Sequence, residues 1–597
     1  MVIRAAYDEL MSAPTTASLL QGAQRALSEG NPRKAADLSR KALRYEPRNS
    51  DAVYFLGLAH ALSGELAAAI DRWRQVMEVN PYQPELRENL ARAYYAQAVD
   101  DHRAGRVTAA LTGYEQALAL IPGFAVAWRD RGRVLESLQR LSDALASYER
   151  AAALTPGDAG SLSGVLSVSV RTCNWQLAGR SLEQLRQLPD GLKSMHPFLA
   201  LSVIEDPAEL ASIAAGRALQ SMVAVGADPS TSFPEPERGE GRIRIAYVSS
   251  DLRDHPVAHL IVGLFEHHNR ERFEVHAIAL NPGADERLRL SVEHWHDVAQ
   301  LSDLETAQRM RTLQIDIAVD LNGHTIGARP GIFAHRAAPI QVSYLGYAGT
   351  SGAPYMDYLV ADDVVIPHAD ERWYTENVIR LPGCFMPNDS QRAIGAPPTR
   401  EQAGLPADGL VFCAFTNAYK INPPLFDIWM RLLREIPGSV LWLRSMGPEP
   451  KNNLLREAAA RGVDAQRLVF APHVASIAEH LGRHRLADLF LDTLPYNAHS
   501  TACDALWVGV PVLTCVGRTF AARVAASVLT TAGLPELITQ DLQEYASLAL
   551  QLARDPAQLQ AFRRRLTQKS ALFDTRAYCE RLENAYSNML ISNPARA

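Results

Sequence analysis

The C-terminal part of the chain alternates short apolar runs with amphipathic segments of helical spacing. The apolar runs form two groups, at 243–249, 273–280, 315–321, 340–345 and 358–361, and at 410–415, 440–443, 468–471, 486–491 and 510–515. Strands that alternate with helices in this way form parallel sheets covered by helices. The pattern therefore predicts two Rossmann-like α/β domains, residues 242–400 and 401–597. Because ligands of such sheets bind at the carboxyl ends of the strands, the inter-domain cleft is the expected active site.

The N-terminal part of the chain is repetitive. Alanines at 35, 69, 110 and 144 each precede by twelve residues the prolines at 47, 81, 122 and 156, and Trp73, Tyr114 and Tyr148 share one position between them. The prolines are 34, 41 and 34 residues apart, and this period with a small residue, an aromatic and a terminal Pro is the tetratricopeptide signature. We predict an α superhelix of tetratricopeptide and degenerate capping repeats over 15–227, with a lengthened helix between Arg92 and Arg106. A Pro- and Gly-rich linker follows at 228–241.

Composition and charge argue against a nucleic-acid-binding or membrane-associated protein. The chain of 597 residues carries a net charge of -6 with a pI near 6.3, which argues against nucleic acid as a partner because phosphate backbones require a basic face. No run of eighteen apolar residues and no secretion signal occur, so no membrane association is expected. Six cysteines stand without Cys-x-x-Cys spacing, as is typical of free thiols in the cytoplasm.

Polar residues follow two strands of the first predicted Rossmann-like domain. His255 comes after the run 243–249 and directly before Pro256, which suits the first position of a helix. It is a candidate general base. The alternatives are a plain helix cap or a metal pair with His259, which we disfavour because no third ligand is near in sequence. After the run 315–321, Asp320 is a second candidate base or electrostatic partner and His324 a candidate sugar contact, unless both only stabilise an Asn-Gly turn.

Further candidates lie in a glycine-rich loop and after the first strand of the second domain. The loop 345–352 supplies backbone N–H groups, and Gly346 and Thr350 are candidate contacts to a sugar or an anion. Asn417, Tyr419 and Lys420 follow the run 410–415. Lys420 is a candidate positive charge for a departing diphosphate, and the alternative is a lysine in a solvent-facing loop.

The segment 492–514 carries the most information in the chain. A polar turn leads from an apolar run into a short helix, and His499, Ser500 and Thr501 stand where that helix begins. The N-terminus of a helix offers free N–H groups and partial positive charge, which suit a phosphate. Asp504 is then placed to accept hydrogen bonds from ribose hydroxyls. The alternative is that Thr501 and Asp504 form only a helix-capping pair, which the same spacing permits.

Just before that segment, His480 and Arg483 are candidates to stack on a base and to neutralise charge, unless both are ordinary helix surface. No Asp-x-Asp pair stands at a strand end with the spacing of a metal-nucleotide site. We therefore expect no metal and no cofactor. A diphosphate would be neutralised by protein cations and a helix dipole.

Several segments in the same order resemble the cytoplasmic O-GlcNAc transferase family, in which tetratricopeptide repeats precede a catalytic region of two Rossmann-like domains (GT-B). The resemblance covers nearly the whole chain, and it is carried by 244–256, 322–325, 338–353, 419–421, 439–443, 486–488 and 492–527.

The resemblance implies roles for single residues. Lys420 would bind the donor's phosphates, and His499, Ser500 and Thr501 would hold the β-phosphate. Asp504 would bind the ribose, His480 and Arg483 would flank the uracil, and Asn417 would lie on the phosphate side. His255 and Asp320 match the two residues considered as general base in the family.

The resemblance also implies an activity. The expected reaction is an inverting, metal-independent transfer of GlcNAc from UDP-GlcNAc to Ser/Thr hydroxyls of proteins, with the repeat groove as a candidate acceptor surface. The alternatives are a UDP-glucose-dependent N-glycosyltransferase of asparagine, a catalytically silent sensor of nucleotide sugars, and a sugar epimerase of the same build. The sequence leaves open the acceptor protein, the donor sugar, the linkage, the base and the oligomeric state.

Overall fold

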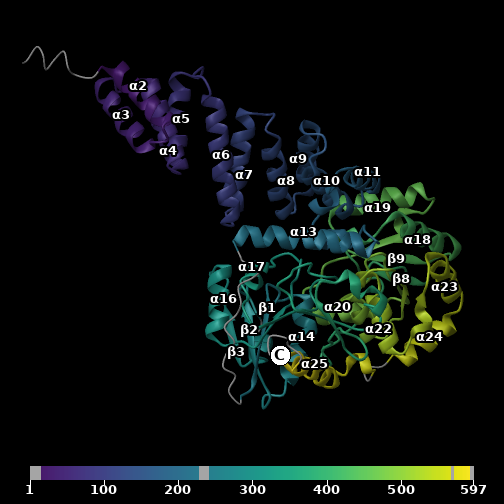
Figure 1. Ribbon diagram of the computed structural model, residues 1–597. Coiled ribbons are helices and arrows are strands. Elements are labelled where there is room, and N and C mark those ends of the chain that lie inside the picture. Colours follow the sequence, from purple (N-terminus) through teal and green to yellow (C-terminus); the bar gives the residue numbers. More distant parts are fainter. Residues whose placement is uncertain (1–14, 227–240, 285, 567–569, 592–597) are drawn as a thin grey trace, which may run out of the picture. The chain divides into compact units, whose positions relative to one another are not determined.

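A computed structural model describes residues 15–226, 241–284, 286–566 and 570–591 (Figure 1). The chain forms two compact units. One comprises Met1–Val168 with Arg180–Leu185, and the other comprises Ser169–Gly179 with Arg186–Ala597. The predicted linker at 228–241 lies, apart from Gly241, outside the described residues.

The first unit consists of antiparallel helix pairs. Its helices are α2 (Thr16–Ser28), α3 (Pro32–Tyr45), α4 (Ser50–Leu62), α5 (Leu66–Val79), α6 (Leu86–Arg103), α7 (Val107–Leu120), α8 (Ala125–Ser137) and α9 (Leu141–Leu154). The repeated small and aromatic residues pack as the pattern predicts. Gly57 of α4 meets Trp73 so closely that a Cβ at Gly57 would lie 2.5 Å from the indole nitrogen. Most of the additional residues of the long repeat interval lengthen α6, as expected, since it has 18 residues against 13 in α4 and α8.

Further helices connect the repeats to the sheets. They are α10 (Ala159–Arg171), α11 (Trp175–Gln187), α12 (Pro197–Ala200) and α13 (Pro207–Val225). The boundary between the two units falls inside α10 and α11, because residues 169–179 belong to the second unit. There the indole nitrogen of Trp175 donates to the Ile421 carbonyl at 3.0 Å. The degenerate region is thus divided between the units.

The second unit contains two parallel sheets. The first sheet has the order β3-β2-β1-β4-β5-β6-β7 and is built from β1 (Ile243–Ser249), β2 (Phe273–Ala279), β3 (His294–Asp297), β4 (Ile317–Asp320), β5 (Ile340–Ser343), β6 (Tyr358–Ala361) and β7 (Asn377–Arg380). The second has the order β10-β9-β8-β11-β12-β13 and is built from β8 (Val411–Ala414), β9 (Val440–Arg444), β10 (Leu468–Ala471), β11 (Leu489–Leu491), β12 (Val512–Cys515) and β13 (Ile538–Thr539).

All ten predicted strands are present, and two Rossmann-like domains follow the repeats as predicted. The apolar pattern missed β3, β7 and β13. Both sheets reverse their strand order at one point, between β1 and β4 and between β8 and β11. Ligands of open α/β sheets bind at this switch point. The turns that carry His255, Asp320, Lys420 and His499 all follow one of these four strands.

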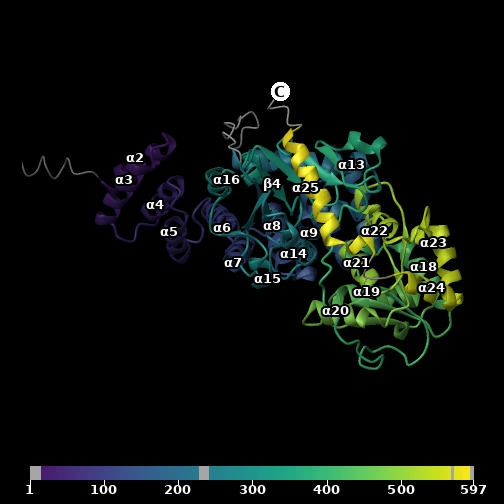
Figure 2. The same cartoon turned by 90° about the horizontal axis from the view of Figure 1, so that it is seen from below.

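Helices cover the sheets of both domains. Those of the first domain are α14 (Pro256–His267), α15 (Glu286–Leu290), α16 (Asp303–Thr312) and α17 (Pro330–Ala334). Those of the second are α18 (Pro423–Glu435), α19 (Pro448–Ala460), α20 (Ile477–His484), α21 (Ser500–Trp507), α22 (Val524–Ala532), α23 (Leu542–Arg554) and α24 (Pro556–Arg565). The last helix, α25 (Thr575–Ile591), returns to the first domain and packs against α14 (Figure 2). Glu583 of α25 accepts there from the buried His268 ring at 3.0 Å.

The six cysteines are free and buried, in agreement with the prediction from their spacing. Among the helices that the structure describes, none is both long and apolar enough to cross a lipid bilayer.

Candidate active site

A cavity of about 270 Å³ lies between the two sheet domains, beside the carboxyl ends of their strands. Its walls come from the turn after β1, the ends of β8, β9 and β10, and helices α20 and α21. Six predicted site residues line it: His255, His480, Arg483, Ser500, Thr501 and Asp504. The cavity therefore brings together residues that are far apart in the sequence, such as His255 and Asp504.

His255 forms the first-domain wall. It is the N-cap of α14, and its Nδ1 accepts from the Val257 N–H at 3.3 Å. Asp251 Oδ2 lies 3.8 Å from the same nitrogen. Burial lowers the pKa of His255, and the Asp251 carboxylate opposes this shift. The ring is therefore neutral at pH 7.

The two neighbours of Nδ1 favour different tautomers of the His255 ring. When Nδ1 accepts from Val257, the proton is on Nε2 and the ring is a donor toward a ligand. When Nδ1 carries the proton and turns it toward Asp251, Nε2 presents a lone pair and acts as a base, with the carboxylate orienting it. The metal-pair alternative with His259 is not favoured here, because His259 Nε2 faces Asp254 at 3.0 Å instead.

An aromatic and cationic group forms the wall at α20. Arg483 Nη2 contacts His480 Nδ1 at 2.7 Å, and the guanidinium lies 5.0 Å from the centre of the Phe415 ring. Burial, with help from Arg483, lowers the pKa of His480 to about 3, so this ring is neutral. Because its Nδ1 receives the Arg483 N–H, its own proton is on Nε2. His480 can therefore stack on a base or donate to a carbonyl oxygen of it, and it is not plain helix surface.

The tip of α21 presents Ser500 and Thr501 to the cavity. The helix begins at Ser500, its N-cap is His499, and no side chain caps it. The alternative of a Thr501–Asp504 capping pair is therefore wrong. The first N–H groups of α21 remain available, as a phosphate requires.

Asp504 is held by an arginine that the sequence analysis did not identify. Arg392 Nη1 donates to Asp504 Oδ1 at 2.6 Å, and both side chains are almost fully buried. The Arg392 guanidinium also lies over the Trp507 ring, 5.2 Å from its centre. Burial raises the pKa of Asp504 and Arg392 opposes that shift. One carboxylate oxygen is thus engaged by Arg392 at the edge of the cavity.

Arg444, at the end of β9, is a second cavity arginine that was missed. Its Nη1 donates to Asn417 Oδ1 at 2.9 Å, and Asn417 Nδ2 donates to the Tyr419 hydroxyl at 2.9 Å. Neither Asn417 nor Tyr419 is among the residues that line the cavity. Within the described structure they position Arg444.

Lys420 is buried and is not among the residues that line the cavity. Its Nζ donates to the Asn497 carbonyl at 2.7 Å and lies 3.6 Å from the centre of the Tyr496 ring. Burial lowers the pKa of Lys420 to about 7, although the nearby Asp492 carboxylate acts in the opposite direction. The solvent-facing alternative for Lys420 is therefore wrong. His499 lies close enough that the Lys420 charge, together with burial, lowers its pKa.

Asp320 ends β4 and is buried. Its Oδ1 accepts from the N–H groups of Asn322 and Gly323 at 2.9 and 3.1 Å, and burial raises its pKa to about 6. His324 Nε2 pairs with the Ser351 carbonyl at 2.8 Å. Neither Asp320 nor His324 is among the residues that line the cavity. Their hydrogen bonds hold the turn and the neighbouring loop, as in the alternative in which both residues only stabilise the Asn-Gly turn.

The glycine-rich loop is anchored to the first domain. Thr350 Oγ1 donates to Glu376 Oε2 at 2.6 Å. A Cβ at Gly346 would lie 2.0 Å from the Leu321 carbonyl oxygen, so glycine is needed for this close approach. Gly346 and Thr350 do not line the cavity described here, and their predicted contacts to a sugar stay predictions.

Two groups of described residues have ligand atoms close enough to share a metal ion: His268, Cys579 and Glu583, and Glu274, His276 and His294. Neither group includes a residue of the cavity.

Comparison with known proteins identifies the family. The profile of glycosyl transferase family 41 matches residues 183–396 and 396–582, and a tetratricopeptide repeat profile matches 20–84 and 95–159. The chain is similar to a probable UDP-N-acetylglucosamine–peptide N-acetylglucosaminyltransferase SEC of Arabidopsis thaliana, with 36% identity over 67% of this chain and 43% of that protein. It is also 30% identical to the Caenorhabditis elegans UDP-N-acetylglucosamine–peptide N-acetylglucosaminyltransferase, over 58% of this chain and 41% of that protein.

The chain thus spans about two fifths of the length of these curated relatives. Among solved structures, a point mutant of Thermobaculum terrenum O-GlcNAc transferase is similar over 97% of both chains, with 29% identity and a TM-score of 0.64. The matched profile covers both sheet domains, including every residue of the cavity. The chain therefore belongs to glycosyl transferase family 41.

Proposed function

We propose that this protein is an inverting, metal-independent glycosyltransferase that moves GlcNAc from UDP-GlcNAc to Ser/Thr hydroxyls of proteins. One observation carries the proposal: the cavity at the carboxyl ends of both sheets combines the tip of α21 with the guanidinium groups of Arg392, Arg444 and Arg483. The names of the relatives support GlcNAc as the sugar and a peptide as the acceptor.

The donor would be held mainly by the second domain. The uracil would stack beside His480 and Phe415, and a ribose hydroxyl would donate to the Asp504 carboxylate. The diphosphate would lie against Ser500, Thr501 and the free N–H groups of α21, where partial positive charge favours an anion.

Lys420 would supply the charge that develops as UDP departs. In the structure its pKa is lowered to about 7 by burial. A diphosphate placed at the tip of α21 would favour the ammonium form and raise that pKa. Lys420 would thus become fully protonated when the donor binds. Its charge would then stabilise the leaving group without a divalent cation.

The first domain would prepare the acceptor. His255, with its Nδ1 proton directed to Asp251, would accept the proton of the attacking hydroxyl at Nε2. The hydroxyl oxygen would bond to the anomeric carbon from the face opposite UDP, so the configuration at that carbon inverts. Asp320, the other candidate base, would remain a turn-stabilising carboxylate.

The test is product analysis with the full chain. UDP-GlcNAc or UDP-glucose is supplied with and without a serine- and threonine-containing peptide, in the presence of a chelator. We expect UDP release only with UDP-GlcNAc and the peptide, and NMR of the glycopeptide should show a β-linkage. Donor binding without UDP release would favour the nucleotide-sugar sensor. Transfer of glucose to an asparagine peptide would favour the N-glycosyltransferase, and loss of activity with chelator would overturn metal independence.

A further inference from the structure

A cluster of imidazoles and one carboxylate lies on β2 and β3 of the first sheet. The parallel register places His276 beside His294, and Ile278 beside His296. Side chains two residues apart in a strand share a face, so Glu274, His276, His294 and His296 all project from one face of the sheet. β3 is the edge strand.

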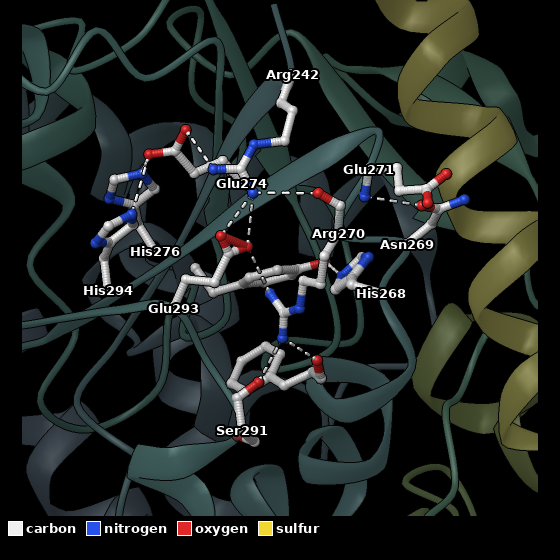
Figure 3. A network of polar contacts seen from close by, with 12 residues as sticks. Arg242, His268, Asn269, Arg270, Glu271, Glu274, His276, Ser291, Glu293 and His294 are labelled. Carbon is white, nitrogen blue, oxygen red and sulfur yellow. Dashed lines mark hydrogen bonds and ion pairs between the residues drawn. The ribbon is translucent and has the colours of Figure 1, made fainter.

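Three of these side chains converge on one point (Figure 3). Glu274 Oε1 lies 3.3 Å from His276 Nε2 and 3.0 Å from His294 Nε2. All three ligand atoms lie within 4.8 Å of one another. Zn²⁺ holds imidazole nitrogens and carboxylate oxygens at about 2.0–2.2 Å in tetrahedral sites, which sets neighbouring ligand atoms roughly 3.3 Å apart. The two distances from Glu274 Oε1 are close to this spacing.

A second observation also points to a ligand. His276 is only 3% exposed, and its Nε2 makes no hydrogen bond of acceptable geometry within the described structure, although Glu274 is near. Buried polar atoms normally have a partner, so an orphaned one requires an explanation. A cation between His276, His294 and Glu274 would satisfy this nitrogen.

We propose that Glu274, His276 and His294 bind one Zn²⁺-type cation through Oε1 and the two Nε2 atoms. His294 is partly exposed, so it provides an entry path and leaves room for a water as the fourth ligand. Imidazole with a single carboxylate favours zinc and its transition-metal neighbours over Mg²⁺ or Ca²⁺, which prefer oxygen ligands.

The surrounding contacts suit this assignment. His276 Nδ1 contacts His296 Nε2 at 3.1 Å. A metal on Nε2 of His276 requires the proton on Nδ1, which then donates to His296, as the outer partners of zinc ligands usually do. Arg242 binds Glu274 Oε2 at 3.2 Å, which orients the carboxylate and leaves Oε1 for the cation. His296 and Arg242 are thus positioning residues.

The cation would link the polar edge strand β3 to β2. Glu274 stands near the start of β2, whereas the donor cavity lies at the carboxyl ends of the strands, and no cluster residue lines it. The proposed role is therefore stabilisation of the sheet edge, independent of the chemistry of sugar transfer.

The experiment uses the full chain without a histidine tag, stripped with chelator and then incubated with Zn²⁺ or Co²⁺. Bound zinc is measured by elemental analysis, and its dissociation constant by competition with a chromophoric chelator. We expect His296→Ala, which removes a positioning residue, to bind zinc about 10–100-fold more weakly than the unchanged chain. His294→Ala and Glu274→Gln, which each remove a ligand, should weaken binding at least as much. Co²⁺ should give the visible absorption of a tetrahedral site.

His267→Ala is the matched control. His267 ends α14 in the same domain, and its Nδ1 contacts the Gly263 carbonyl at 2.8 Å, so this variant should bind zinc like the unchanged chain. Zinc should raise the melting temperature of the unchanged chain and of this control, but not of His294→Ala. Equal zinc affinity in His294→Ala, Glu274→Gln and the unchanged chain would overturn the proposal. Absence of a Co²⁺ spectrum in the unchanged chain would do the same.

Discussion

The two sheet domains have the same strand order but contribute different chemistry to the cavity. The first contributes the turn after β1 and the start of α14, with His255 and His259, and Arg392 from the irregular segment after β7. The second contributes Arg444, Arg483 and the uncapped tip of α21. Under the proposed function, the first switch point would move a proton and the second would hold an anion.

The difference shows that the strand order places polar turns at the switch point of each sheet, whereas the side chains of those turns determine what can bind or react there. Both switch points present polar turns after buried strands. The second lies beside arginines that are fixed by partners, as Arg444 is by Asn417 and Arg483 by His480. Fixed cations suit a charge that is present throughout the reaction, whereas a neutral imidazole suits a transient proton.

The largest expected effect concerns His255, the proposed base in the first domain. His255→Ala should lower kcat/KM by about 10²–10⁴-fold and flatten the acidic side of the pH profile. A base acts when deprotonated, and burial lowers the pKa of His255 from its ordinary value, so the unchanged enzyme should lose activity only below about pH 6.5. Asp320→Asn should keep this acidic limb. The opposite result would identify Asp320 as the base. In that case the unchanged protein would show an acidic limb with a midpoint near pH 6, where burial places the pKa of Asp320, and Asp320→Asn would lack that limb.

The buried ion pair of the cavity should dominate the stability of its surroundings. Arg392→Met leaves the Asp504 carboxylate buried without its partner, which should cost about 3–5 kcal/mol of unfolding free energy. Urea denaturation followed by intrinsic tryptophan fluorescence, to which the adjacent Trp507 contributes, measures this. The double variant Arg392→Met/Asp504→Leu should recover most of the loss, because it leaves no unpaired charge. An equal loss in the double variant would show that packing, not charge, is responsible.

Lys420→Ala should lower kcat/KM for transfer by about 10²–10³-fold, since the proposed positive charge for the leaving group would be lost. Steady-state kinetics with UDP-GlcNAc and a peptide measure this effect. Lys451→Ala, which changes an exposed lysine of α19 in the same domain, is the control and should be close to unchanged. Full turnover by Lys420→Ala would contradict the proposal that the second domain binds the donor through Lys420.

The smallest effect should come from the residues behind Arg444. Asn417→Ala removes the acceptor of the Arg444 guanidinium and should raise the KM for UDP-GlcNAc about tenfold, because a hydrogen bond to a charged group contributes roughly 1.5–3 kcal/mol. Tyr419→Phe leaves Asn417 in place and should have a smaller effect. A change in kcat with constant KM would mean that Asn417 acts on the reaction step instead of on donor binding.

The apolar pattern predicted strands well where both faces of a strand are buried. It failed at the sheet edges. β3 reads His-Trp-His-Asp and β7 reads Asn-Val-Ile-Arg, and both have exposed or half-buried positions that carry polar side chains. An edge strand is partly solvated, so its sequence lacks the continuous apolar run of a central parallel strand.

The candidate site was predicted in part. Residues directly after strands at the switch points were found, because the carboxyl ends of parallel strands meet there. Arg444 directly follows the predicted strand 440–443 and could have been found by applying this rule to the strand next to the switch point. Arg392 could not have been found in this way, because it stands in an irregular segment after β7. It reaches the cavity through its pairing with Asp504, 112 residues later.

The sequence by itself determined the repeats, the two α/β domains and the turns that carry polar side chains, because these depend on local periodicity and on the residues next to each strand. Only the tertiary structure decided which of those side chains reach the cavity. Lys420 and Asp320 are buried and do not line it, Asn417 accepts from Arg444, and Glu274 meets His294 across two strands. Such contacts join residues that are distant along the chain, and burial then sets their charge, which spacing in a sequence does not encode.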